Sequence, residues 1–163
     1  MTKPLWAPWR LEYIQQADEE TGCVFCDEAA GALSADASLL VHAGDRAIAL
    51  MNKYPYSSGH LMVSPRRHVG DLSGLTDGEA LEIHHLAATG VDTLNRVYEP
   101  GGFNLGWNLG RMAGAGIADH VHLHVVPRWA GDTNFMPVLA DVKVIPEHLL
   151  ATRDRLRGAW TSG

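Results

Sequence analysis

The sequence contains little cysteine: Cys23 and Cys26 are the only two in 163 residues. Two cysteines cannot make a disulfide framework, and their CxxC spacing is typical of metal binding or redox chemistry. Basic residues are also scarce, 13 against 19 acidic ones. The formal net charge of −6 argues against a general nucleic-acid binder, so an anionic ligand would need a local group of donors.

Long hydrophobic runs are missing as well. No apolar stretch approaches the roughly 20 residues that span a membrane, so we expect no membrane partner. The first ten residues, MTKPLWAPWR, contain proline and tryptophan where a signal peptide would have a continuous apolar core. We therefore expect a cytoplasmic protein, with an apolar content of 46% that is ordinary for a globular domain.

Hydrophobic periodicity predicts an α+β fold. The expected strands cover residues 46–52, 60–69, 102–110 and 120–128. The first two should pair as a hairpin, and Cys23–Cys26 should form a tight turn. A helical period covers residues 72–98, where Thr76 and Glu79 fit a capping box, and a C-terminal helix is expected over 146–158.

Three histidines alternate with apolar residues in the segment DHVHLHVVPRW, residues 119–129. Side chains on a strand point alternately to its two faces, so His120, His122 and His124 should share one face, roughly 6.6 Å apart. The intervening valines and leucine should pack into the core. A lone histidine more often coats a solvated sheet face, but three in strict alternation beside a glycine-rich loop favour a site. Alternating histidines can also chelate a metal, which stays open for one of them.

The triad HVHLHVV resembles the signature of the histidine triad family of nucleotide hydrolases and transferases. The blocks AIALMN, GHLMVSPRRHV and FNLGWNLG precede it in the family's order, so the resemblance covers roughly residues 22–130. It implies an antiparallel sheet of about five strands, flanked by a long helix and a C-terminal helix, usually in a homodimer. We expect one domain over residues 1–163, with an N-terminal extension (1–20) and a C-terminal tail (131–163) around this core.

The resemblance also implies the chemistry of the triad. His122, the middle histidine, matches the residue that attacks the α-phosphate of a nucleotide and forms a covalent nucleotidyl-histidine. A neutral imidazole is a competent nucleophile near pH 7. His124 should donate hydrogen bonds to phosphate oxygens. A backbone carbonyl is expected to hold the second ring nitrogen of His122, but the sequence does not identify it.

The loop RMAGAGIAD, residues 111–119, is the expected phosphate cradle. Gly114 and Gly116 would let backbone N–H groups approach an anion closely, although the loop alone could equally be a plain connection. Many relatives carry Gln, Ser or Thr just before the triad, whereas this chain has Gly116 and Ile117. Our hypothesis is that the space left there admits inorganic phosphate as the attacking group.

Three further residues match or adjoin positions of the family site. Asn52 matches a ribose contact, with a turn-forming asparagine as the alternative. Asn108 matches a polar position near the phosphates, with a sheet-end asparagine as the alternative. Trp129 follows the triad directly and is expected either to stack on a purine or to fill a dimer interface.

The resemblance assigns the cysteines to a metal site. Cys23, Cys26, His68 and His120 would close a tetrahedral Cys₂His₂ site for structural zinc, with no open position for catalysis. A redox role is less favoured because no thioredoxin-like βαβ pattern surrounds the CxxC, and two reduced thiols without metal are the remaining alternative. No organic cofactor is expected.

Segments outside the triad indicate the branch of the family. LWAPWRLEYI, WNLG and VVPRWAGDTNFMPV resemble the diadenosine tetraphosphate phosphorylases. We therefore expect phosphorolysis of diadenosine tetraphosphate to ATP and ADP, with an adenine nucleotide and inorganic phosphate as partners and a homodimer or higher homo-oligomer as the assembly. A hydrolase of dinucleoside polyphosphates or nucleoside phosphoramidates, and a nucleotide-binding module without turnover, remain alternatives.

Overall fold

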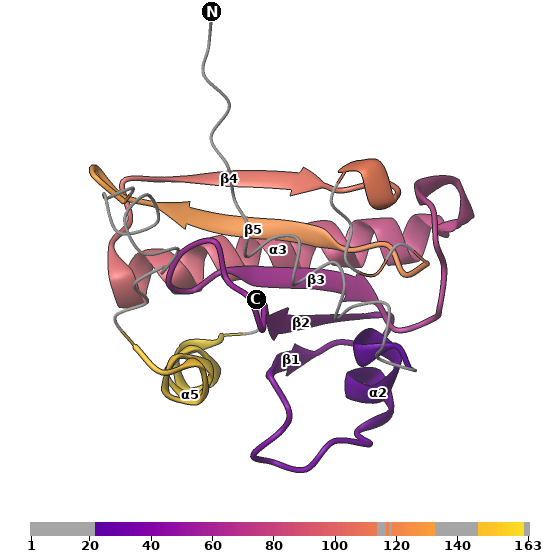
Figure 1. Ribbon diagram of the computed structural model, residues 1–163, viewed down its shortest axis with the longest axis horizontal. Coiled ribbons are helices and arrows are strands. Elements are labelled where there is room, and N and C mark those ends of the chain that lie inside the picture. Colours follow the sequence, from indigo (N-terminus) through magenta and orange to yellow (C-terminus); the bar gives the residue numbers. More distant parts are fainter. Residues whose placement is uncertain (1–21, 114–116, 118, 133–146, 162–163) are drawn as a thin grey trace, which may run out of the picture.

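The computed structural model describes residues 22–113, 117, 119–132 and 147–161. Five strands in this part of the chain form one sheet in the spatial order β1-β2-β3-β5-β4 (Figure 1). Their bounds are β1 Leu40–Ala43, β2 Ala47–Met51, β3 Leu61–Pro65, β4 Gly102–Trp107 and β5 Leu123–Arg128. All neighbouring pairs are antiparallel, which confirms the predicted α+β class and the hairpin, now β2–β3.

The long helix α3, Asp77–Tyr98, begins later than predicted. Residues Leu72–Gly74 form the short 3₁₀ helix η1 instead, and α3 starts after Thr76. The Thr76 side chain accepts the backbone N–H of Glu79, and the Glu79 carboxylate accepts the N–H of Thr76. This reciprocal pair confirms the predicted capping box and fixes where the helix begins.

Two shorter helices lie near the β1 end of the sheet (Figure 1). Helix α2, Val24–Ala30, occupies the place where we expected a tight turn, so that prediction is wrong: Cys23 is the N-cap, and a full helix follows. Burial of Phe25 and Glu28 explains why so short a helix forms. The C-terminal helix α5, Leu149–Ala159, lies close to the predicted range, and residue 146 falls outside the described residues. Within the part of the chain that is described, no helix is long and apolar enough to cross a membrane.

All four predicted strands extend beyond the observed ones: the prediction for β2 is one residue too long at each end, and the prediction for β4 is three residues too long at its end. The differences at β3 and β5 share one cause. β3 ends at Pro65, which has no N–H to continue a ladder. The last described β3–β5 pair is Val63 with Leu123, so β5 begins at Leu123 and not at residue 120. The segment before β5 is not part of the β3–β5 ladder. Its Val121 N–H donates instead to the carbonyl of Val69, which follows β3.

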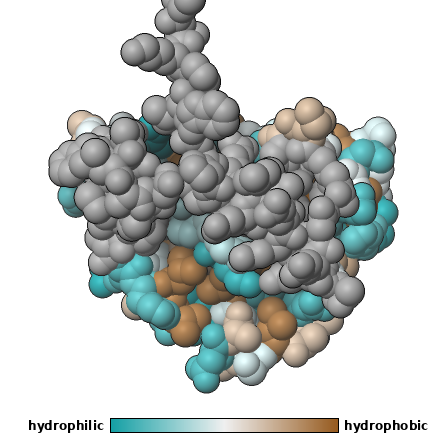
Figure 2. Space-filling view, in the orientation of Figure 1, coloured by the Kyte–Doolittle hydropathy of each residue, from teal (hydrophilic) through white to brown (hydrophobic). Residues whose placement is uncertain are grey.

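One face of the sheet carries α2 and a small apolar cluster. Phe25 of α2 packs there with Ile48, Leu50 and Met62 from β2 and β3. The sheet lies in front of α3 in Figure 1, so this face is turned toward the viewer. Figure 2 shows the same side, where a group of hydrophobic residues is surrounded by hydrophilic ones.

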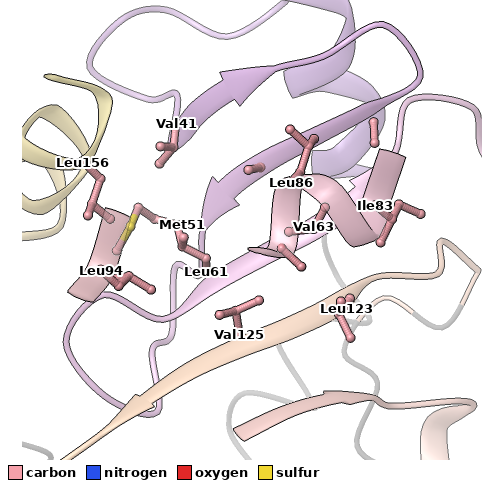
Figure 3. Close-up of a cluster of buried hydrophobic side chains, with 13 residues drawn as sticks. Val41, Met51, Leu61, Val63, Ile83, Leu86, Leu94, Leu123, Val125 and Leu156 are labelled. Carbon is pink, nitrogen blue, oxygen red and sulfur yellow. The ribbon is translucent and has the colours of Figure 1, made fainter. Parts of the chain in front are cut away.

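The main core lies on the other face, between the sheet and α3 (Figure 3). Its labelled members come from every strand except β4 and from both longer helices: Val41, Met51, Leu61, Val63, Ile83, Leu86, Leu94, Leu123, Val125 and Leu156. Leu123 and Val125 project into this core, so His124 between them projects from the opposite face. The alternation in the sequence therefore predicts correctly which β5 side chains face the core and which face carries His124.

Candidate active site

The three histidines occupy the segment that leads into β5. His124 lies within the strand, whereas His120 and His122 precede it. In chain order they are 0%, 6% and 7% exposed, so they do not form a solvated sheet face. The rings of His122 and His124 meet edge to face, with centroids 4.8 Å apart. The sequence pattern thus marks a buried, closely packed cluster of imidazoles.

A backbone carbonyl fixes the proton of the His122 ring. Nδ1 of His122 lies 2.8 Å from the carbonyl oxygen of His120. A carbonyl oxygen can only accept, so Nδ1 carries the hydrogen and Nε2 keeps its lone pair. Burial lowers the pKa of His122, and the bond to this carbonyl offsets part of that effect. The ring is therefore neutral near pH 7 with Nε2 unprotonated, which is the form a nucleophile requires.

His124 is bonded at both ring nitrogens. Nε2 lies 3.2 Å from Nδ2 of Asn108, and Nδ1 lies 2.9 Å from Nε2 of His60. Burial, and then the neighbouring His122, lower the pKa of His124 to about 4. The structure therefore brings Asn108 to the triad as expected and keeps His124 neutral at physiological pH.

His60 is the site residue that sequence reasoning missed. It precedes β3 and is fully buried against His124. Gly59 before it has φ +78°, and a Cβ there would lie 2.7 Å from Leu94, so glycine is required for this approach. Met62 pairs with His124 across the sheet, which puts His60, two residues earlier, on the same face. That register is not visible in a single sequence.

Asn52 lies on the far side of His60 from the triad. Its Oδ1 accepts the N–H of Tyr54 at 2.9 Å, and its Nδ2 lies 3.5 Å from Nδ1 of His60. The N–H of Tyr56 donates to the same Nδ1 at 3.0 Å. Asn52 thus belongs to the network behind His124, and it also shapes the turn after β2, as the alternative interpretation had it.

The remaining predicted binding residues are not part of this cluster. Gly114 and Gly116 lie outside the described residues. Trp129 follows the far end of β5, seven residues after His122, which is roughly 23 Å along an extended chain at about 3.3 Å per residue. Its indole N–H donates to the carbonyl of Tyr98 at 3.4 Å. Within one chain, Trp129 is therefore remote from the triad.

The four predicted metal ligands converge in space. The ligand atoms of Cys23, Cys26, His68 and His120 all lie within 4.8 Å of one another. Nδ1 of His120 is 3.1 Å from Sγ of Cys23, and Nδ1 of His68 is 3.3 Å from Sγ of Cys26. Ligands around a tetrahedral zinc at about 2.0–2.3 Å lie roughly 3.3–3.8 Å apart, so the cluster has the dimensions of such a site.

Two details of this cluster suit a metal. Nε2 of His120 lies 2.9 Å from the carbonyl of Pro65, so it carries the hydrogen and leaves Nδ1 free to bind. Burial, and then the neighbouring Cys23, raise the pKa of Cys26 to about 11. A thiol with this pKa stays protonated unless a cation binds, and a divalent metal reverses that preference. These residues can therefore hold a metal ion, and the same His120 supplies the carbonyl that orients His122.

Known proteins share both the sequence and the fold. The HIT domain family matches residues 35–131. A protein of Mycobacterium tuberculosis named AP-4-A phosphorylase is 40% identical over 162 residues, covering 96% of this chain and 83% of the relative. An uncharacterized HIT-like protein of Mycoplasma genitalium is 30% identical, covering 71% of this chain and 79% of the relative.

A solved structure has the same arrangement of strands and helices. The crystal structure of a zinc-bound histidine triad family protein from Mycobacterium smegmatis superposes with a TM-score of 0.68 at 23% identity, covering 85% of this chain and 93% of that one. At this identity the match shows the fold. The family match over the whole sheet and the triad, with the relative that is 40% identical, establishes that this chain belongs to the HIT domain family.

Proposed function

We propose that the protein is a nucleotidyltransferase that cleaves dinucleoside polyphosphates through a covalent nucleotidyl-His122 intermediate. The observation that carries this proposal is the bond from Nδ1 of His122 to the carbonyl of His120, which leaves Nε2 unprotonated. A binding module would not need a buried imidazole with its tautomer fixed in this way. The relative named AP-4-A phosphorylase, similar over nearly the whole chain, supports an enzyme acting on nucleotides.

The proposed reaction has two displacements at one phosphorus. In the first, Nε2 of His122 forms a P–N bond to the α-phosphorus of diadenosine tetraphosphate, and the P–O bond to ATP breaks. In the second, an oxygen of inorganic phosphate attacks the same phosphorus, the P–N bond breaks, and ADP leaves. Splitting the transfer avoids one difficult direct displacement. With water as the acceptor the products would be AMP and ATP.

Residues around His122 are assigned to binding the substrate. His124 and Asn108 lie beside His122 and would bind oxygens of the transferred phosphoryl group. Gly114 and Gly116 would cradle the phosphates, and the space beside Gly116 would admit the attacking phosphate. Asn52 would contact the ribose. Trp129 would reach a nucleotide only in another copy of the chain or would fill the interface between copies.

We also propose that Cys23, Cys26, His68 and His120 bind zinc as a closed structural site. All four positions are then taken by protein ligands, so the metal supplies rigidity and no open coordination site. It would tie the start of α2 to the segment that carries His122. Thiolate ligands require reduced cysteines, which fits the cytoplasmic location that we propose.

A homodimer is the proposed assembly, with β4 at the interface. β4 is the last strand of the sheet, so one of its edges has no partner strand among the described residues (Figure 1). Leu105 on this strand is 49% exposed, and Leu109 just beyond it is 50% exposed. An exposed edge strand with apolar side chains is a template for pairing with a second copy. Leu105→Glu should convert the dimer to monomer in light scattering, and an unchanged mass would exclude this interface.

The test of function is product analysis with diadenosine tetraphosphate, with and without inorganic phosphate. We expect ADP and ATP with phosphate and little cleavage without it. AMP and ATP in both conditions would make the protein a hydrolase with the same nucleophile. No cleavage in either condition would refute the proposed activity. His85→Ala, on the exposed surface of α3, is the matched control for His122→Ala.

A further inference from the structure

Tyr56 is an exposed aromatic residue that lies directly against the triad. It belongs to the turn between β2 and β3 and is 38% exposed, and Tyr54 in the same turn is 44% exposed. Every other Phe, Tyr or Trp side chain that the structure describes is at least partly buried. Of these two exposed rings, that of Tyr56 touches an imidazole of the triad, so its position bears on the reaction.

The ring of Tyr56 lies over two buried imidazoles. Its centroid is 5.9 Å from that of His124, and the two ring planes are 27° apart. Its centroid is also 4.7 Å from that of His60, with the planes 35° apart. His124 is 7% exposed and His60 is fully buried, whereas Tyr56 is half-exposed. Tyr56 therefore forms the layer between these imidazoles and solvent.

Hydrogen bonds hold the turn that carries this ring. The N–H of Tyr56 donates to Nδ1 of His60 at 3.0 Å, and the N–H of His60 donates to the carbonyl of Ser57 at 3.2 Å. The Ser57 hydroxyl donates to the carbonyl of Pro127 in β5 at 2.7 Å. Because the turn is fastened to the start of β3 and to β5, the ring of Tyr56 keeps a fixed position relative to His124.

A ring in this place acts on His124 in two ways. Its face limits rotation of the imidazole away from the position in which Nε2 lies 3.2 Å from Nδ2 of Asn108. It also keeps water from the imidazole, and a hydrogen bond to a charged phosphoryl oxygen is stronger where water is excluded. Burial is the first cause of the low pKa of His124, as expected for an imidazole shielded in this way.

We propose that Tyr56 is a positioning residue: its stacked ring holds the His124 imidazole in place and excludes water from it, so that His124 is ready to bind an oxygen of the transferred phosphoryl group. The choice of that ligand rests on the proposed function, whereas the stack rests on the ring geometry alone. Tyr56 acts through His124 and touches no reacting atom. The ring and not the hydroxyl makes the contact, so phenylalanine should serve as well as tyrosine at this position.

The first test is an NMR titration of the His124 imidazole in the full-length protein, with its signals identified by their loss in His124→Asn. Among the described residues, the titratable groups whose rings contact His124 are Tyr56 in the turn, His60 before β3 and His122 before β5. Tyr56→Ala leaves both of these histidines in place and lets water reach the imidazole. The pKa of His124 should therefore rise toward its ordinary value of about 6.5.

Two further variants show whether the ring is responsible. Tyr56→Phe should keep the pKa of His124 low, because the stacked ring remains. Tyr54→Ala is the matched control, since it removes the other exposed tyrosine of the same turn. It should leave the His124 titration unchanged. A pKa of His124 that is the same in the wild type and in Tyr56→Ala would overturn the proposal.

The second test is turnover of diadenosine tetraphosphate by the same variants. Tyr56→Ala should lower kcat roughly 10- to 100-fold with KM changed little, because a misplaced catalytic group slows the chemical step. Tyr56→Phe should recover most of this loss, and Tyr54→Ala should match the wild type. An unchanged kcat in Tyr56→Ala would overturn the proposal, and so would a raised KM alone, which would make Tyr56 a substrate contact. If Tyr56→Ala fails to fold, Tyr56→Leu, which keeps apolar bulk without a flat ring, replaces it in both tests.

The two proposals fail in different ways. An inactive wild type in which the pKa of His124 depends on the Tyr56 ring would refute the proposed function and leave the stack intact. An active wild type whose kcat does not depend on that ring would refute the positioning role and leave the nucleophile assignment intact.

Discussion

Acid should destabilise this protein through His124, because the ring is buried and held neutral. Burial, and then the adjacent His122, lower the pKa of His124 from 6.5 to about 4. In the unfolded chain the ring regains a pKa of about 6.5. Between these two values the unfolded state binds more protons than the folded state, so the free energy of unfolding falls as the pH falls.

The size of the effect follows from the shift. The pKa of His124 falls from 6.5 to about 4, and each pKa unit corresponds to about 1.4 kcal/mol, which gives about 3.5 kcal/mol in total. About 2 kcal/mol of this should already be lost at pH 5 relative to pH 7. The contribution is fully present above pH 6.5 and is gone below about pH 4.

This loss of unfolding free energy can be measured by urea unfolding at pH 7 and pH 5, with the wild type compared to His124→Asn. The other buried histidines titrate in both proteins, so the difference between the two pH dependences isolates His124. We expect the wild type to lose about 2 kcal/mol more than the variant over this interval. His85→Asn, at an exposed position on α3, controls for the loss of a histidine as such. Equal losses in wild type and His124→Asn would refute the reasoning.

Three further predictions concern stability and metal. Wild-type protein should contain about one zinc per chain and lose thermal stability in a chelator, whereas Cys23→Ser should contain little zinc and show no chelator effect; a metal-free wild type would contradict the site. Glu79→Gln should cost about 1 kcal/mol at pH 7. The Arg67 hydrogen bond and then the Thr76 N–H lower the pKa of Glu79 from 4.5 to about 2, so that cost should shrink as the pH falls from 4.5 and vanish near 2. A cost independent of pH would contradict the ionised Glu79 carboxylate as its source. Leu94→Ala, at a fully buried position of α3, should cost about 2–5 kcal/mol in urea unfolding, and Leu81→Ala, 57% exposed on the same helix, should cost far less.

Much of the site could be predicted because it is encoded by local spacing. The alternation in HVHLHVV places His124 opposite Leu123 and Val125 on β5, and the structure has this arrangement. The CxxC and the resemblance to the family name four residues that do converge. The capping box at Thr76 and Glu79 was equally readable, since it requires only two residues at a fixed separation.

The parts that could not be predicted depend on register and on tertiary bonds. His60 reaches His124 because β3 and β5 pair at Met62 and His124, and no local pattern specifies that register. The carbonyl that fixes His122 belongs to His120, whose backbone turns before β5 begins. Helix α2 replaces the expected turn because Phe25 finds an apolar cluster on the sheet, a contact that the CxxC spacing does not reveal.

The most direct measurement is the site of covalent modification during turnover. The protein would be mixed with diadenosine tetraphosphate labelled in the adenylyl group, without phosphate, quenched in base, digested and mapped by mass spectrometry. The account predicts one adenylyl group on His122, released as ADP when phosphate is added before the quench, and no adduct in His122→Asn. An adduct on another residue, or wild-type turnover by His122→Asn, would contradict it.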